Sequence, residues 1–222
     1  LNVALLEPND YAAGVMRQLW AEMGGTWTGG VREGKMGGGM QPIHVHESAS
    51  LGEIVRDMNK FSNNVMARQL FLTIGAERSG APADGANSSA AIRAWLAQTG
   101  IAGPGLVMEN GSGLSRDERV SAATLAAVLQ AAWRSNVMPE FIASMPIAAV
   151  DGTMRRRLKG EGVSGNEHIK TGLLSDVRAT AGYILDRNGR RHAVVMFVNH
   201  PNAGATQAAH DALLRWVYDT GR

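Results

Sequence analysis

The chain has 222 residues, of which 45% are hydrophobic and 19% are charged, and its formal net charge is +2. This length and apolar content allow a buried core, and the weak, mixed charge argues against nucleic acid or a membrane surface as partner. No apolar run is long enough to span a bilayer, and the absence of cysteine excludes disulfides and thiolate metal sites.

The N-terminal part predicts two helices on either side of a glycine-rich stretch. Residues 12–23 have a helical apolar period and end at a pair of glycines. Residues 24–39 contain eight glycines, which predicts a surface loop around a short strand. Ser50 and Glu53 form a capping-box pattern that opens the next helix. The expected inward face of that helix consists of Leu51, Ile54, Val55 and Met58.

The middle of the chain continues as helices. A break over residues 61–64 is followed by a second helix that we expect to stop at Gly75. Two more helices are predicted at about 86–98 and 122–134, the latter opened by Ser121. Between them, Asn110-Gly111-Ser112-Gly113 is a strong turn signal.

The C-terminal third changes to strands. Residues 168–172, 179–186 and 192–199 have strand patterns, and Asn188-Gly189 predicts a hairpin turn between the last two. A final helix is predicted at about 205–218, with Ala209, Leu213, Trp216 and Val217 on one face. The expected fold class is therefore α+β, with a helical part, three antiparallel C-terminal strands and a last helix.

Two short motifs could carry chemistry. Ser62-Asn63-Asn64 lies in the break between two helices, and Lys170-Thr171-Gly172 lies at the end of a predicted strand. A Ser-x-Asn triplet alone is common by chance, and Lys-Thr-Gly is roughly ten times rarer. Each also has a purely structural interpretation, because Ser62 could cap the second helix and Thr-Gly could be ordinary turn chemistry.

In this order, the two motifs resemble the second and third signature motifs of penicillin-recognising serine enzymes. Their surroundings resemble one branch, the class C low-molecular-mass penicillin-binding proteins, which are DacB-like D-alanyl-D-alanine carboxypeptidase/endopeptidases of the peptidase S13 type. The resemblance covers about residues 5–219. It rests on the stretches 56–64, 111–116, 151–154 and 170–172.

This resemblance implies a penicillin-binding-protein/β-lactamase-like transpeptidase domain. It implies serine-type D-Ala-D-Ala carboxypeptidase or endopeptidase activity on peptidoglycan stem peptides, through an acyl-serine intermediate that β-lactam antibiotics trap. No cofactor is implied. The expected location is the periplasm, with the signal peptide outside this chain. The rival is a non-catalytic protein of the same fold that binds peptidoglycan.

The nucleophile motif of that family, Ser-x-x-Lys, is absent. The chain has only four lysines, and none has serine three residues before it. The positions three residues before these lysines are occupied by Arg32, Asp57, Arg156 and Glu167. We therefore expect residues 1–222 to be the C-terminal portion of the catalytic domain, without its nucleophile segment and inserted domains, and inactive in isolation.

The resemblance assigns catalytic roles to three residues. Ser62 would relay a proton to the leaving amine. Asn64 would hold the peptide backbone of the substrate and orient the catalytic lysine. Lys170 would supply positive charge near the oxyanion and the terminal carboxylate.

Three further residues would bind substrate. Thr171 would hydrogen-bond the carboxylate, and Gly172 would let the strand approach the ligand closely. The backbone N–H of Leu173 would be an oxyanion donor. The family commonly has Thr, Ser or His at this position, so Leu173 removes a polar side-chain contact and weakens any inference about substrate preference.

Three other patterns favour structural interpretations. The G-x-G-x-x-G pattern at 160–165 precedes a strand, whereas a dinucleotide site needs it after one. His44 and His46 could share one face, but no third ligand at suitable spacing completes a zinc site. Residues 155–157 are three arginines that we expect to form a solvated face, with contact to an anionic polymer as the alternative.

Overall fold

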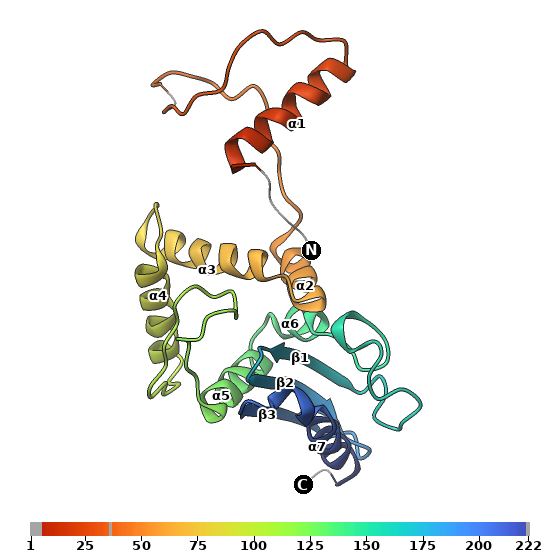
Figure 1. The fold of residues 1–222 in the computed structure, drawn as a ribbon. Coiled ribbons are helices and arrows are strands. Elements are labelled where there is room, and N and C mark those ends of the chain that lie inside the picture. The colour runs from red at the N-terminus through yellow and green to blue at the C-terminus, as the bar shows by residue number, and fades with distance from the viewer. Residues whose placement is uncertain (1–5, 36, 221–222) are drawn as a thin grey trace. The chain divides into compact units, whose positions relative to one another are not determined.

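The structure is a computed structural model that describes residues 6–35 and 37–220. These residues fall into two units, one up to Glu47 and one from Ser48 onward. The first unit contains helix α1, Pro8–Glu22, followed by an irregular segment (Figure 1). None of the residues of α1 is buried. No strand forms over residues 24–35 or 37–39, so the predicted strand is wrong, because glycines there supply almost no side chains to pack.

The second unit begins with five helices, two of which start at the predicted capping residues. The Ser50–Glu53 capping box is present, and the Ser121 hydroxyl accepts a 3.0 Å hydrogen bond from the Thr124 N–H. The helix from Met138 was not predicted. These helices are α2 (Leu51–Phe61), α3 (Asn64–Ser79), α4 (Gly85–Gln98), α5 (Ala122–Trp133) and α6 (Met138–Ser144).

Two details of the helical part differ from expectation. Helix α3 does not stop at Gly75 but runs through it, because this glycine lies where α3 meets α4 and a Cβ would overlap the Ser88 hydroxyl. Leu51, predicted to face inward, is 63% exposed because it is the first residue of α2. Close packing between helices therefore outweighed the local preference of glycine for a helix end.

The three predicted strands form one antiparallel sheet in the order β1-β2-β3. They are β1 (Glu167–Leu173), β2 (Val177–Leu185) and β3 (Arg191–Asn199), each within two residues of its predicted bounds. Lys170 of β1 pairs with Ala181 of β2. This confirms the α+β class, with its strands toward the C-terminus.

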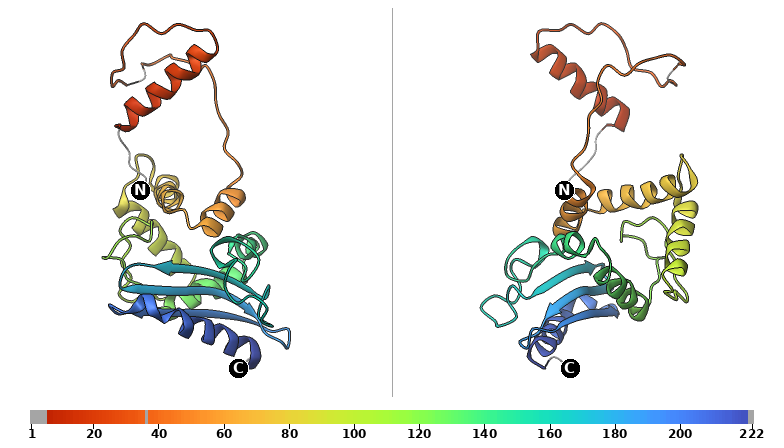
Figure 2. Two further views of the ribbon diagram at one scale, coloured as in Figure 1. Left: turned by 45° about the vertical axis from the view of Figure 1, so that its right-hand side comes forward. Right: turned by 180° about the vertical axis from the view of Figure 1, so that it is seen from behind.

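The sheet has a hydrophobic core on each face, as alternation along the strands requires. On one face, Ile169, Ile184 and Val194 pack against helix α7, Gln207–Thr220, through Leu214 and Val217. On the other face, Tyr183 packs with Leu129 of α5 and with residues of α6. Figure 2 shows the sheet with these helices from two further directions.

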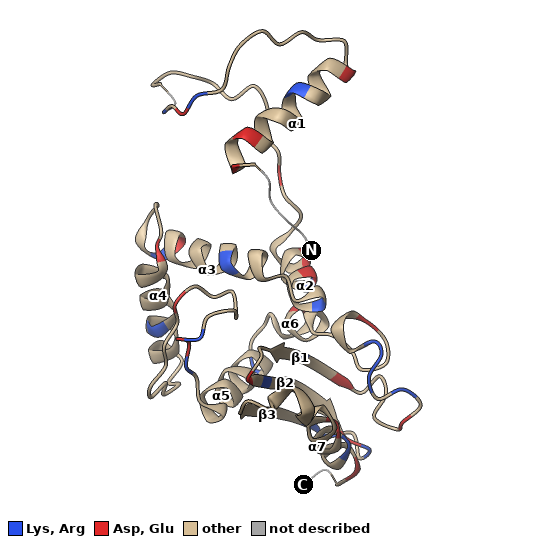
Figure 3. Ribbon diagram, viewed as in Figure 1, with Lys and Arg blue, Asp and Glu red and all other residues tan. Residues whose placement is uncertain are grey.

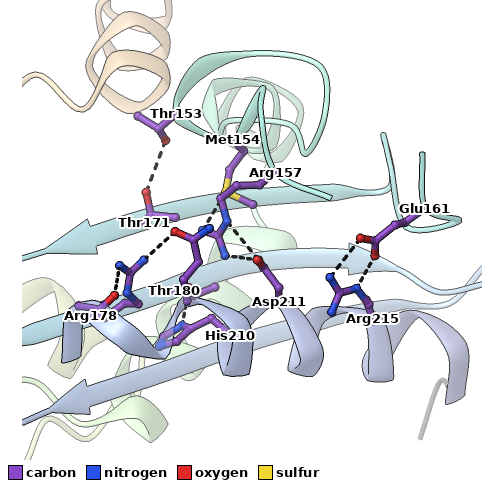
Figure 4. A network of polar contacts seen from close by, with 12 residues as sticks. Thr153, Met154, Arg157, Glu161, Thr171, Arg178, Thr180, His210, Asp211 and Arg215 are labelled. Atoms are coloured by element: carbon purple, nitrogen blue, oxygen red, sulfur yellow. Dashed lines mark hydrogen bonds and ion pairs between the residues drawn. The ribbon is translucent and has the colours of Figure 1, made fainter. Parts of the chain in front are cut away.

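The buried face of α7 differs from the predicted one. His210, Leu214 and Val217 are buried, whereas Trp216 is 53% exposed. His210 is inside because its Nδ1 lies 2.8 Å from the Thr180 hydroxyl on β2, a contact drawn in Figure 4. A polar residue thus occupies a core position that apolar periodicity could not mark.

Charges of both signs are interspersed along the second unit (Figure 3). Over the part of the chain that the structure describes, no helix is long and apolar enough to cross a membrane. Two short 3-10 turns, Gly152–Met154 and Ala203–Thr206, complete the elements.

Candidate active site

The junction between α2 and α3 contains Ser62, whose side chain does not cap α3. Ser62 is the C-terminal cap residue of α2, in the left-handed conformation with φ 55° and ψ 48°. The side chain of Asn63 accepts a 3.1 Å hydrogen bond from the Met66 N–H and so caps α3. The interpretation that Ser62 caps the second helix, α3, is therefore wrong, because Asn63 does so. Its left-handed backbone costs energy for a non-glycine residue, and such outliers cluster at functional sites.

Lys170 reaches this junction from β1. Its ammonium group donates hydrogen bonds of 2.7 Å to the Ser62 hydroxyl and 2.8 Å to the Thr171 carbonyl. Burial lowers the pKa of Lys170, because desolvation disfavours the charged amine. Since Ser62 accepts from Lys170, its own hydroxyl proton is free to be donated to another group.

Asn64 connects the junction to the predicted turn at 110–113. Its side-chain amide donates a 2.5 Å hydrogen bond to the Ser112 carbonyl. The turn is held in shape by bonds from the Ser112 hydroxyl to the Asn110 side chain and from the Gly111 N–H to Glu118. One donor of the Asn64 amide is thus committed to positioning this loop beside Ser62.

The six predicted site residues line one hollow of about 420 Å³. The Thr171 hydroxyl lies 3.5 Å from that of Thr153, and the side chain of Leu173 is 62% exposed at the end of β1. A larger hollow of about 750 Å³ adjoins it, sharing Gly113, Gly172 and Leu173. The arrangement joins a polarised hydroxyl, a desolvated amine and an exposed strand end, groups that can relay a proton and accept an extended ligand.

The family model for D-Ala-D-Ala carboxypeptidase 3 (S13) matches residues 1–219. The chain belongs to this S13 family. Among curated relatives, it is 33% identical over 216 residues to the D-alanyl-D-alanine carboxypeptidase of Actinomadura sp. (strain R39), covering 93% of this chain and 40% of that protein. It is 28% identical to the D-alanyl-D-alanine carboxypeptidase DacB of Haemophilus influenzae, covering 92% of this chain and 43% of that protein.

The fold of this S13 chain matches a solved relative as well. It superposes on penicillin binding protein 4 (dacB) from Haemophilus influenzae, crystallised with a β-lactam, with a TM-score of 0.83 and 26% identity. That match covers 96% of this chain and 53% of the crystallised one. This likeness confirms the penicillin-binding-protein fold. The S13 chain spans about two fifths of the length of the curated relatives named above.

Sequence reasoning missed two residues beside the site of the S13 chain. Lys60 is buried, with 8% exposure, and its ammonium group donates hydrogen bonds to the Met145 carbonyl and to Asp151. Both residues lie in stretches that carried the family resemblance. The turn around Lys60, residues 56–61, is mostly polar, so no local pattern marked this lysine as buried.

The patterns set aside at the sequence level have the following places. His44 and His46 lie in an irregular, exposed segment, and the described residues contain no cluster of three or more metal-binding side chains. Residues 160–165 lie in turns before β1 and open no helix. The solvated face predicted for residues 155–157 is only partly right, because the Arg157 side chain is largely buried and pairs with Asp211.

Proposed function

We propose that the protein containing this chain is a serine-type D-Ala-D-Ala carboxypeptidase or endopeptidase that acts on peptidoglycan stem peptides. The observation that carries the proposal is the 2.7 Å bond from Lys170 to Ser62, which joins the two family motifs across 108 residues. Family membership over residues 1–219 supports the reaction class. Because peptidoglycan lies outside the cytoplasmic membrane, the protein would be exported to the periplasm.

The proposed reaction is acyl transfer through a serine ester. A nucleophilic serine from a Ser-x-x-Lys motif outside these 222 residues adds to the carbonyl carbon of the D-Ala-D-Ala bond, and its proton passes to the paired lysine. The C–N bond then breaks, and the departing amine of D-alanine takes that proton through the Ser62 hydroxyl. Water hydrolyses the ester, whereas a β-lactam would leave it blocked.

The remaining site residues would hold the substrate. The side-chain oxygen of Asn64 would accept a hydrogen bond from a substrate N–H, while its amide nitrogen donates to the Ser112 carbonyl. Thr171 would hydrogen-bond the terminal carboxylate, with the positive charge of Lys170 next to it. Gly172 leaves the strand open to edge-on approach, and the Leu173 N–H would donate to the oxyanion.

The test compares acylation by a fluorescent penicillin in the longer protein and in its Lys170→Ala variant. We expect the variant to react roughly 10²-fold more slowly or worse, the usual scale for one oxyanion-site group. The exposed Lys159 provides the control, and Lys159→Ala is expected to react like the wild type. Unchanged acylation of Lys170→Ala would refute the proposed role.

The isolated 222-residue chain gives a second arm. Without a Ser-x-x-Lys serine it should show no covalent penicillin adduct by intact-mass spectrometry. Co-expression with the nucleophile segment should restore labelling by about 10³-fold or more, as loss of a catalytic-triad member leaves only residual activity. An adduct on the chain alone would place the nucleophile within these residues.

A further inference from the structure

The segment that runs from the last residue of α6 into the 3-10 turn contacts both elements that carry the site. We define residues 144–153 as the bridging segment. Ser62 follows helix α2 and Lys170 lies on strand β1, and no local sequence pattern fixes the distance between the two. The bridging segment makes polar contacts to α2 on one side and to β1 on the other.

Its contacts to α2 center on Lys60, two residues before Ser62. The Lys60 ammonium group donates 2.6 Å to the Met145 carbonyl and 2.7 Å to Asp151 Oδ2. One residue earlier, the Asn59 side-chain amide donates a 2.8 Å hydrogen bond to the Ser144 hydroxyl. The last turn of α2 is therefore attached to both ends of the bridging segment.

Two features make this attachment rigid. The second oxygen of Asp151, Oδ1, accepts a 2.8 Å bond from the Ile147 N–H, so one carboxylate closes the loop and binds Lys60. Gly152 has φ +54°, and a Cβ there would lie 2.7 Å from the Lys60 carbonyl oxygen. The backbone of the bridging segment thus lies directly against the backbone of α2.

The same segment is bonded to β1. The Ile169 N–H donates 2.8 Å to the Pro146 carbonyl, and the Ala148 N–H donates 3.2 Å to the Glu167 carbonyl. Further along, the hydroxyls of Thr153 and Thr171 face each other at 3.5 Å (Figure 4). Ile169 and Thr171 flank Lys170, so these contacts hold the strand on both sides of the lysine.

We propose that the ion pair between buried Lys60 and partly exposed Asp151 is a positioning element that sets the distance between the Ser62 hydroxyl and the Lys170 ammonium group. This inference rests on the proposed function of that site and names two residues that serve it without touching substrate. The Lys60 side chain is buried, but that of Asp151 is 38% exposed, so solvent screens the pair and its net contribution to stability is small. Its placement in a segment that is bonded to both motif-bearing elements gives it a positioning role.

The test uses the double variant Lys60→Met with Asp151→Asn. It removes both charges together, keeps most of the length of the lysine side chain, and keeps an oxygen to accept from the Ile147 N–H. In the longer protein we expect acylation by penicillin to slow by roughly 10- to 100-fold, the scale of a small misplacement of reacting groups. Reversible binding before acylation should change by less than about 3-fold, since Thr171 and Gly172 remain.

A direct measurement on the chain separates this inference from the proposed function. The chain has four lysines, so with 13C-labelled lysine each Cε–Hε group can be resolved by NMR. In the double variant, the Lys170 signal should move toward the position of the exposed Lys159 signal, because its ammonium group leaves Ser62. The matched control Lys159→Met should leave the Lys170 signal in place.

The outcomes are distinct. An unshifted Lys170 signal with unchanged acylation would overturn the positioning role, while the proposed function would stand. A shifted signal in a protein that no penicillin acylates would keep the positioning role and refute the function. If the double variant does not fold, Asn59→Ala removes only the bond to Ser144 and should shift the same signal less, and no shift there would again overturn the inference.

Discussion

The two faces of strand β1 treat a buried ionisable group in opposite ways. Lys170 points to the face of α5 and α6, where its ammonium group donates to Ser62 and Thr171. Glu167, three residues earlier, points to the α7 face, and its two carboxylate oxygens are buried with no hydrogen-bond partner among the described residues. Burial raises the pKa of Glu167 to about 8. The same strand thus holds an amine that is partnered and a carboxyl that is kept neutral.

The contrast shows where the fold can tolerate charge. Desolvation disfavours both ionised groups, but only Lys170 has two oxygen acceptors and an opening to solvent to offset it. Glu167 has Arg157 nearby, yet that guanidinium already pairs with Asp211, as Figure 4 shows. The two faces therefore differ in the partners that they offer: the site face gives Lys170 two acceptors, whereas on the α7 face the nearby cation is already paired and Glu167 has none.

The largest expected effect on stability comes from disturbing the pairing of β1 with β2. Gly182 of β2 pairs with Ile169, and a Cβ there would overlap the His168 carbonyl oxygen. Gly182→Ala should therefore force β1 and β2 apart and lower the free energy of unfolding by about 3 kcal/mol or more, the scale of an overpacked core. Urea unfolding of the wild type and the variant measures this difference in free energy.

Gly204→Ala is the matched control, because a Cβ at Gly204 would meet nothing within 4 Å. It should unfold within about 0.5 kcal/mol of the wild type, as surface changes usually do. If Gly182→Ala were equally silent, the close approach of the two strands would not be a constraint on the fold.

The elements of this fold were predictable where a local pattern decides them. The strands were found within two residues, because alternation and the Asn188-Gly189 turn act over a few neighbours. The motif residues 62–64 and 170–172 were found because they are contiguous. Helix α6 was missed because it has only seven residues and contains Pro139.

Features that depend on distant contacts were not predictable. Lys60 and Asp151 are 91 residues apart, and no sequence period connects them. Gly75 was predicted to end a helix, because its packing against α4 cannot be read from its neighbours. The neutral, buried Glu167 is a third case, because a charged residue beginning a strand ordinarily indicates an exposed end.

A smaller effect is expected from removing the titrating carboxyl of Glu167 on the α7 face. Glu167→Gln keeps the shape of the side chain but cannot ionise. In the wild type, the pKa is about 8 when folded and near its ordinary value when unfolded, so the stabilising effect is complete below about pH 4.5. It is lost as pH rises toward 8, because the unfolded chain releases a proton that the folded chain retains.

The wild type should therefore lose about 1.4 kcal/mol of stability per pH unit over this window relative to Glu167→Gln. Urea unfolding at pH 5.5, 6.5 and 7.5 gives both slopes, and all other titrating groups are common to the two proteins. Glu109→Gln, at an exposed position, should keep the wild-type slope. Parallel slopes for the wild type and Glu167→Gln would mean that Glu167 ionises inside the fold.

The smallest expected effect on stability is on the site face. Lys170→Met replaces a desolvated amine by an apolar side chain of similar length, and water can reach the partly exposed Ser62 hydroxyl in its place. Because burial lowers the pKa of Lys170, its charged form is disfavoured by folding at neutral pH. The variant should therefore have a free energy of unfolding within about 1 kcal/mol of the wild type, or slightly above it, although we expect slower acylation in the longer protein. Ile169→Ala, one residue away and fully buried, should instead cost about 2–5 kcal/mol. If Lys170→Met lowered the free energy of unfolding as much as Ile169→Ala, Lys170 would be a stabilising residue of the fold.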